Sequence, residues 1–306
     1  MKKIAVLFQI GNYETWNKMK ELICNFDSDI ILMTHFNTDL IKESQINDII
    51  NYYDSLNIKC IITKFKNKGM DIAGFFKQIQ YIIDNNIKID FIFKLHTKSN
   101  DKWRSQLVDP ICSSKKNVND CIHILDNQDV GIVCCERWFR KMDHFNTPII
   151  LNEMKKMNIS NEYIDDIDWE LKNDMLYDLN FFDPDFYLQY SYNKIPIIKN
   201  LDNDPEKLKS YALFHWLQIG YDKFRLIHNE KLIKKKNKHI SFCAGSIFWI
   251  DATILISFFK KNIDFEFYFE NFESGYFNND LPTLTHSWER FFAIILEINE
   301  KKTIVL

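Results

Sequence analysis

An apolar run within residues 91–99 ends abruptly in basic and hydroxyl side chains. The segment reads FIFKLHTKS, and its apolar part is typical of a buried strand. Alternate residues of a strand point to the same face, so Lys94 and His96 share a face, while Thr97 and Lys98 continue past its end. Ligands of open α/β sheets bind just beyond the carboxyl ends of the strands. The cluster therefore predicts a bound phosphate or carboxylate, and a nucleotide is the first ligand to consider.

Another cation follows this strand end closely, because Trp103 and Arg104 open the next expected helix. The groups that can carry a positive charge here are Lys94, His96, Lys98 and Arg104. Converging on one point, they would repel one another unless an anion joined them. A diphosphate would supply that anion. The plainer alternative is a basic surface patch without a ligand.

The loop Asn67-Lys68-Gly69-Met70-Asp71 lies one strand earlier, before an expected helix. Gly69 permits a positive φ or a close approach of the backbone to a ligand. Asp71 is placed either to cap the helix or to accept a hydrogen bond from a sugar or a base. The plain alternative is an ordinary strand-to-helix turn with an Asp cap. Its position beside the basic cluster, at the same edge of the sheet, favours a ligand.

A third polar group opens an otherwise apolar helix near the C-terminus. It consists of His286, Glu289 and Arg290, which could supply a general base and substrate contacts. The alternative is an amphipathic helix in which Glu289 pairs with Arg290 or another neighbour, and the spacing alone favours it.

The elements that must position these residues alternate between strand and helix patterns in the first half of the chain. Strands are expected at 3–9, 29–35, 58–65, 89–95 and 130–135, and helices at about 13–26, 43–56, 71–84, 101–113 and 116–126. This order predicts an α/β fold with a mostly parallel, Rossmann-like central sheet flanked by helices.

The second half of the chain changes character and then returns to the sheet. Residues 148–236 are rich in Asn, Asp, Lys and Tyr and read as a helical insertion. The main domain is thus expected to comprise residues 1–147 and 237–306. Its later elements are a strand at 240–250, a helix at about 252–261, an aromatic loop at 264–279, a helix at 284–298 and a strand at 302–306.

Composition excludes several classes of protein. The 306 residues are 46% hydrophobic and 15% aromatic, enough for a substantial core. A net charge of -3 argues against a nucleic-acid binder, and the basic run at 231–238 reads as a solvated loop. No window resembles a signal peptide or a membrane helix. The seven cysteines include no C-x-x-C motif, which favours reduced thiols and a cytoplasmic protein, with peripheral membrane association left open.

Taken together and in order, the motifs resemble the rhamnan synthesis protein F family of glycosyltransferases. They are N-x-G-x-D from Asn67, K-x-H-T-K-S from Lys94 followed by W-R, A-G-S-x-F-W from Ala244, and H-x-x-E-R from His286. The resemblance covers residues 1–140 and 238–300. It implies an A-type glycosyltransferase fold, a donor activated by UDP, dTDP or GDP, often carrying L-rhamnose, and a polysaccharide or glycan acceptor.

The resemblance also implies roles for individual residues. Donor contacts would come from Phe8, Gln9, Thr34, Asn67, Gly69, Asp71, Lys94, His96, Lys98 and Arg104. Acceptor or sugar contacts would come from Gly245, Trp249 and His286, and Glu289 would act as the base of an inverting transfer.

Glycosyltransferases of this fold generally hold Mn²⁺ or Mg²⁺ with a D-x-D motif at the strand end where this chain has His96-Thr97-Lys98. The departure makes a metal cofactor doubtful and leaves His96 as its single candidate ligand there. D-x-D spacings occur elsewhere, at Asp27, Asp166, Asp183 and Asp202, but none follows the expected strand.

The insertion contains a further pattern, from Phe182 to Arg225, that is similar to a short helical module of glycosyltransferase-associated proteins. A small helical pair with its own aromatic core is the favoured interpretation. Two alternatives to a transferase remain open. One is a non-catalytic glycan-binding or scaffold protein, and the other is a nucleotidyltransferase or similar nucleotide-processing enzyme, which would need carboxylates holding metal near Lys98.

Overall fold

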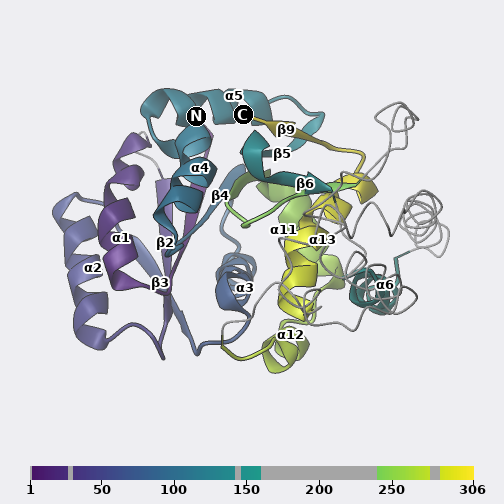
Figure 1. Ribbon diagram of the computed structural model, residues 1–306, viewed down its shortest axis with the longest axis horizontal. Coiled ribbons are helices and arrows are strands. Elements are labelled where there is room, and N and C mark those ends of the chain that lie inside the picture. Colours follow the sequence, from purple (N-terminus) through teal and green to yellow (C-terminus); the bar gives the residue numbers. More distant parts are fainter. Residues whose placement is uncertain (1, 27–29, 142–145, 160–239, 276–282) are drawn as a thin grey trace, which may run out of the picture.

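Figure 1 shows the chain as a computed structural model, which describes residues 2–26, 30–141, 146–159, 240–275 and 283–306. The described part is an α/β fold around one central sheet of seven strands. The strands of this sheet are β1 (Ile4–Ile10), β2 (Ile30–Asn37), β3 (Cys60–Phe65), β4 (Phe91–His96), β5 (Val130–Cys134), β8 (Phe248–Asp251) and β9 (Lys302–Val305).

The strand order is β3-β2-β1-β4-β8-β5-β9, and β8 alone runs antiparallel to its neighbours. The chain winds from β1 outward to β3 and then crosses back to β4, so the direction of winding reverses between β1 and β4. Ligands of open α/β sheets bind at such a switch point, outside the carboxyl ends of the strands. A second, two-stranded sheet joins β6 (Phe139–Lys141) to β7 (Ser241–Cys243).

Helices cover both faces of the sheet, and each face has its own apolar core (Figure 1). One face carries α1 (Tyr13–Met19), the 3₁₀ helix η1 (Lys20–Asn25), α2 (Glu43–Ser55), α4 (Asp101–Cys112) and α5 (Lys115–Leu125). The other carries α3 (Met70–Asp84), α6 (Thr147–Lys156), α11 (Ala252–Asn262), α12 (Phe265–Asn271) and α13 (Leu284–Ile298). A short 3₁₀ helix, η2 (Glu136–Trp138), follows β5.

Aromatic side chains join the helices of the second face. The ring of Phe76, on α3, lies edge-on to Phe259 at 4.9 Å, to Phe272 at 5.2 Å and to Trp288 at 4.8 Å between centroids. Each pair adds about 0.5–1.5 kcal/mol beyond the burial of its area. Segments far apart in the sequence are thereby held against α3, and α13 among them.

The predicted fold class is confirmed, while three expected elements differ from the structure. The strand expected at 240–250 is two short strands, β7 and β8, because Gly245 and Ser246 adopt positive φ angles of 92° and 47° and turn the chain. The aromatic loop expected at 264–279 contains α12, which begins at an Asp264 cap. The helix expected at 13–26 is α1 followed by η1.

Both expected segments of the main domain, before and after the predicted insertion, contribute strands to the central sheet. From the insertion the structure describes α6 and little more. The module from Phe182 to Arg225, the basic run at 231–238 and all four D-x-D pairs lie outside the described residues. All seven cysteines are unpaired thiols. In the described part of the chain, every helix is too short or too polar to cross a membrane.

Candidate functional site

Within the basic cluster at the end of β4, Lys94 is paired with a carboxylate of the protein itself. Lys94 points to the α3 face, where its ammonium group hydrogen-bonds to the carboxylate of Asp71 and, at 2.9 Å, to the backbone carbonyl of Ser246. The hydroxyl of Ser246 lies 3.1 Å from Lys94 Nζ and donates to Asp71 Oδ2 at 2.6 Å. Because the Lys94 side chain is completely buried, a ligand cannot reach its charge from solvent.

His96 shares this face with Lys94, as the alternation of the strand predicts. Its Nδ1 lies 3.1 Å from Asp71 Oδ2, although not in good hydrogen-bond geometry. Burial lowers the pKa of His96, and Asp71 opposes that shift only in part, so the ring is neutral near pH 7. Burial alone would raise the pKa of Asp71, but the facing His96 and Lys94 hold it well below its ordinary range. The lasting charge opposite this carboxylate is therefore that of Lys94.

Asp71 does not cap α3. The N-cap position is Gly69, which makes no side-chain capping bond, and the Asp71 carboxylate turns instead toward Lys94 and Ser246. Of the two roles open to Asp71, the cap is thus wrong, because a buried lysine offers its carboxylate a stronger partner than a backbone N–H.

The turn between β7 and β8 brings Glu289 to the same place. The backbone N–H of Gly245 donates to Glu289 Oε1 at 2.5 Å. A Cβ on Gly245 would lie 2.8 Å from the Leu107 side chain and 3.4 Å from the Trp103 ring, so glycine fits this turn at φ 92° without moving those side chains. The Glu289 side chain remains 19% exposed, which leaves the carboxylate accessible from solvent.

Lys98 completes the site from beyond the strand end. Its Nζ lies 3.2 Å from the ring centroid of Trp103, and in the described part of the chain it forms no salt bridge. Burial lowers the pKa of Lys98, while the nearby charges of Glu289 and Asp71 oppose that shift. Lys94 and Arg104 each have a carboxylate partner, whereas Lys98 has no salt-bridge partner among the described residues.

His286 and Arg290 flank Glu289 on α13. His286 Nδ1 lies 2.9 Å from the hydroxyl of Thr283, which caps the helix. Arg290 donates to the His286 carbonyl at 2.9 Å and lies 3.5 Å from Glu289 Oε2. Burial lowers the pKa of His286, and Glu289 opposes that shift. The pairing of Glu289 with Arg290, which the spacing predicts, is therefore present together with the approach to Gly245.

The Asn67 loop is held by another loop of the chain. Gly69 has a φ of 61°, and its N–H donates to the Glu273 carbonyl at 2.7 Å. Asn67 accepts a hydrogen bond from Asn37 at 2.9 Å. The Glu273 carboxylate accepts from the backbone of α13, at Leu284 and Thr285, so this loop links the starts of α3 and α13.

Arg104 lies on the opposite face of the sheet from Asp71. Its guanidinium forms an ion pair with Asp101 at 2.9 Å and donates to the Lys98 carbonyl at 2.8 Å. Arg104 thereby fixes the backbone that carries Lys98, and its own charge is already paired.

Of the remaining predicted site residues, Gln9 lies beside His96 in the register of β1 and β4, and the others lie on the far face of the sheet. Phe8 and Thr34 belong to the α1 face, whereas Gln9 points to α3 and hydrogen-bonds to Gln78. Trp249 is completely buried in the core of the α1 face, where its Nε1–H donates to the Ile111 carbonyl at 3.1 Å. The Trp249 ring therefore has no exposed surface on which a sugar could stack, and its predicted contact with a sugar is not possible in this structure.

Ser246 belongs to the A-G-S motif, but the motif itself predicts no contact for its hydroxyl. The signal was the position of a hydroxyl directly after a glycine in a segment otherwise apolar enough for a continuous strand. Thr97, the hydroxyl of the cluster predicted to bind an anion, instead contacts the backbone. Its hydroxyl accepts from the N–H groups of Gly11 at 2.9 Å and Asn12 at 3.1 Å and so ties the end of β1 to the end of β4.

The residues at the end of β4 do not fit a divalent cation. The carboxylate of Asp71 is already bonded to Lys94 and Ser246, and positive charge lies on both sides of His96. Among the described residues, no three His, Cys, Asp or Glu side chains are grouped as metal ligands. Compared with models of known protein families and with curated proteins, the sequence matches none.

Proposed function

We propose that this protein is a glycosyltransferase, which moves a sugar, L-rhamnose or a related deoxysugar, from a nucleotide-diphosphate donor to a glycan. The observation that carries the proposal is the meeting of Asp71, Lys98, Gly245 and Glu289 beside the switch point of the sheet. These residues come from four separate segments of the chain, and a purely structural ion pair would not require the exposed carboxylate of Glu289.

Lys98 is the group best placed to bind the donor's diphosphate. It lies beyond the end of β4 near the carboxylates of Asp71 and Glu289, and the indole of Trp103 holds its ammonium group in place. Lys94 acts indirectly, by keeping Asp71 charged and fixed. In this assignment a lysine takes the part that a metal ion plays in related folds.

Glu289 is the proposed base. Its carboxylate would accept the proton of the attacking acceptor hydroxyl while the acceptor oxygen bonds to the anomeric carbon of the donor. The bond from that carbon to the diphosphate oxygen breaks on the opposite side, and the nucleoside diphosphate leaves with the electron pair. This displacement inverts the anomeric centre. The N–H of Gly245 would orient the carboxylate through its 2.5 Å contact with Oε1.

One observation favours a second function, a non-catalytic glycan-binding protein. Lys94 is satisfied by Asp71, and Arg104 by Asp101, so the chain itself balances two of the charges that a diphosphate was expected to meet. In that case the sheet and the site would persist as a scaffold. The nucleotidyltransferase alternative has no comparable support, because the described residues contain no group of three or more His, Cys, Asp or Glu side chains that could hold a metal ion.

Nucleotide binding separates these functions. UDP, dTDP and GDP, each with and without Mn²⁺, are added in turn and the unfolding temperature is measured. A nucleotide at about 100 times its Kd should stabilise the fold by about 2.7 kcal/mol. Lys98→Met should remove most of that effect and Lys98→Arg should keep it, since charge is what binds. If none of the nucleotides stabilises the protein, the transferase proposal fails and the scaffold is favoured. A requirement for Mn²⁺ would refute the metal-free assignment.

A further inference from the structure

Four side chains beside the site lie in the order cation, indole, indole, cation. Lys98 Nζ lies 3.2 Å from the Trp103 ring, the rings of Trp103 and Trp138 are 5.0 Å apart at 39°, and the Arg140 guanidinium lies 5.0 Å from the Trp138 ring. We call Lys98, Trp103, Trp138 and Arg140 the cation–indole surface. It extends from the end of β4 across the start of α4 to η2 and β6.

This surface differs from the aromatic clusters of the core. Trp249 and Trp288 are completely buried, whereas Trp103 and Trp138 are only half-buried and Arg140 is exposed. Stacking of this kind is worth about 0.5–1 kcal/mol per exposed cation–ring contact. A fold that needed only packing would gain more by covering both indoles.

Of the two indole N–H groups, that of Trp138 has a hydrogen-bond partner among the described residues and that of Trp103 has none. Trp138 Nε1–H donates to the side-chain oxygen of Gln106 at 3.1 Å, which fixes its ring plane. Trp103 Nε1–H is buried and has no hydrogen-bond partner among the described residues.

The surface is continuous with the proposed catalytic site. Trp103 packs under Gly245, whose N–H binds Glu289, and Lys98 belongs to both sets. A molecule lying on the two indoles would therefore lead directly toward the carboxylate of Glu289.

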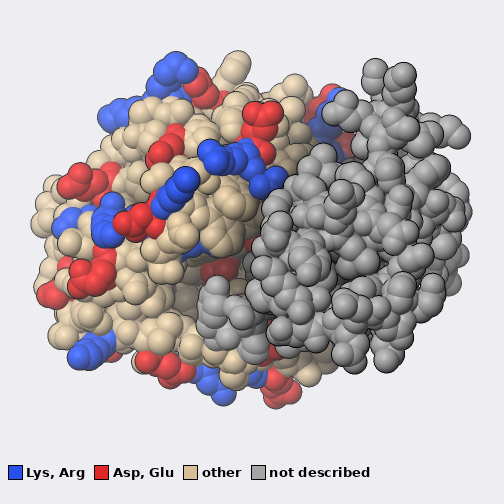
Figure 2. Space-filling model, viewed as in Figure 1, with Lys and Arg blue, Asp and Glu red and all other residues tan. Residues whose placement is uncertain are grey.

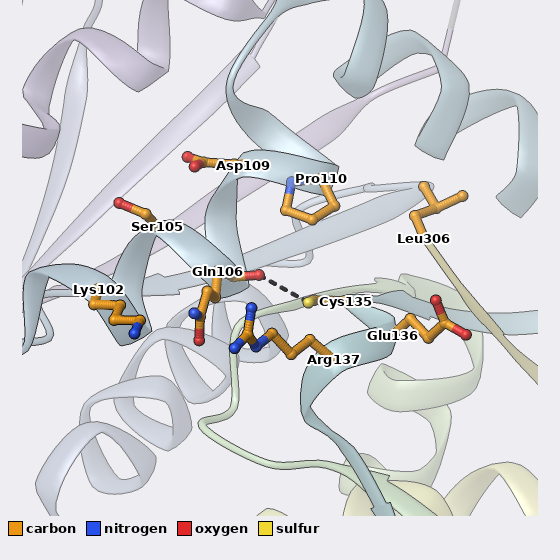
Figure 3. Close-up of a pocket in the computed structure, with 9 residues that line it drawn as sticks. All are labelled: Lys102, Ser105, Gln106, Asp109, Pro110, Cys135, Glu136, Arg137 and Leu306. Atoms are coloured by element: carbon orange, nitrogen blue, oxygen red, sulfur yellow. Dashed lines mark hydrogen bonds between the residues drawn. The ribbon is translucent and has the colours of Figure 1, made fainter.

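Basic side chains gather around the surface. Figure 2 shows lysine and arginine side chains collected on the face that lies over α4 and β6. Beside it lies a hollow of about 500 Å³, in which Lys102 and Arg137 approach each other across Gln106 (Figure 3). Asp109 and Glu136 also line this hollow, so the hollow itself is balanced in charge. The positive charge on the indoles that is left for a ligand is therefore that of Arg140, because Asp71 and Glu289 lie near Lys98.

We propose that the cation–indole surface binds the acceptor, and that the acceptor is a saccharide bearing carboxylate or sulfate groups. The faces of the sugar rings would stack on Trp103 and Trp138, and an anionic group would pair with Arg140, which leaves Lys98 for the diphosphate of the donor. This inference rests on the proposed transferase function for the name "acceptor", while the binding itself does not depend on catalysis.

Binding is tested without any nucleotide. Tetragalacturonate, a heparin tetrasaccharide and neutral maltotetraose are titrated into the full chain, followed by tryptophan fluorescence and calorimetry. The two anionic probes should quench the indoles, and at least one should bind at least about tenfold more tightly than maltotetraose. Arg140→Gln and Trp138→Ala should each weaken that binding at least about fivefold, while Trp138→Phe should keep most of it.

Lys59→Gln is the matched control, because Lys59 is also exposed but lies before β3, at the opposite end of the sheet. This variant should bind the probes as the natural sequence does. Equal affinity for neutral and anionic probes, or full affinity in Arg140→Gln, would overturn the proposal. Saccharide binding without nucleotide binding would support the proposed binding surface and contradict the proposed transferase function. Nucleotide binding with no response to either anionic probe would contradict the binding surface and leave the transferase proposal supported.

Discussion

Lys94 near the end of β4 and Asp71 at the start of α3 form an ion pair whose lysine is wholly buried. The pair also contacts Ser246, from a segment more than 150 residues further along the chain. It therefore fastens a strand, a helix and the turn before β8 at one point. The charge that suggests a ligand in the sequence is, for Lys94, satisfied by the protein itself.

Removing one member of this pair should cost more stability than removing both. Lys94→Met leaves the Asp71 carboxylate without its main partner, and the expected loss is about 3–5 kcal/mol in the free energy of unfolding. Asp71→Leu should be similarly damaging. The double variant should be clearly more stable than the sum of the single losses implies. Urea unfolding of the four proteins measures the coupling, and additive losses would show that the pair contributes little.

Glu289→Gln should separate donor binding from transfer. The amide oxygen can still accept from the N–H of Gly245, so the turn should be retained, but the side chain can no longer take up a proton. Transfer should fall by about 10²–10⁴ while the Kd for the nucleotide changes little. Glu14→Gln, on the exposed side of α1, is the control with the same chemical change. Retained turnover in Glu289→Gln would remove Glu289 as the base.

Gly69 should tolerate alanine less well than Gly275 does. Both have a positive φ, of 61° and 88°, so both variants carry backbone strain of about 1–2 kcal/mol. A Cβ at Gly69 would also lie 2.7 Å from Ala73 and 2.9 Å from Phe272, whereas at Gly275 nothing lies within 4 Å. Overpacking should add about 1–3 kcal/mol to the loss in Gly69→Ala. Thermal or urea unfolding compares the two, and equal losses would mean that the loop yields freely.

Acid should destabilise the fold through His35. Burial is the main cause that lowers the pKa of His35 to about 3 in the folded protein, with Lys77 adding to the shift. Below about pH 6.5, His35 is protonated in the unfolded chain but stays neutral in the folded protein. The free energy of unfolding therefore falls as the pH drops from about 6.5 toward 3. The slope from this group is at most about 1.4 kcal/mol per pH unit.

His96 and His286 also have lowered pKa values and act in the same direction, so a variant is needed to isolate His35. His35→Asn retains a polar atom near Thr63, the partner of His35 Nδ1 at 3.0 Å, but cannot titrate. Its stability should depend less on pH between 6.5 and 4.5 than that of the natural sequence. Identical slopes would contradict a neutral buried His35.

Much of the fold could be predicted because the strands that form its centre carry their own signals. The apolar runs of β1, β4 and β5 are buried along their whole length and appear in the sequence as continuous hydrophobic segments. The stretch at 240–250 misled for the same reason. Hydrophobicity alone does not show that Gly245 and Ser246 adopt positive φ, since the packing of Gly245 against α4 requires that turn.

The site was predictable in its membership more than in its roles. The sequence pointed to Asp71, Lys94, His96, Lys98 and Glu289, and the structure places them near one another. Phe8, Gln9 and Thr34 could not be judged in the same way. Neighbouring residues of a strand point to opposite faces of the sheet. In the register of β1 and β2, Phe8 and Thr34 point to the α1 face, whereas Gln9 points to the α3 face.

The sequence by itself determined the order of strands and helices, the alternation that puts Lys94 and His96 on one face, and the abrupt change from apolar to basic residues at the end of β4. The tertiary structure alone decided which anion meets which cation. Asp71 reaches Lys94 because α3 covers the face of the sheet to which Lys94 points, and Lys98, beyond the strand end, forms no salt bridge among the described residues. Pairings between distant segments depend on packing and register, which no local pattern of residues encodes.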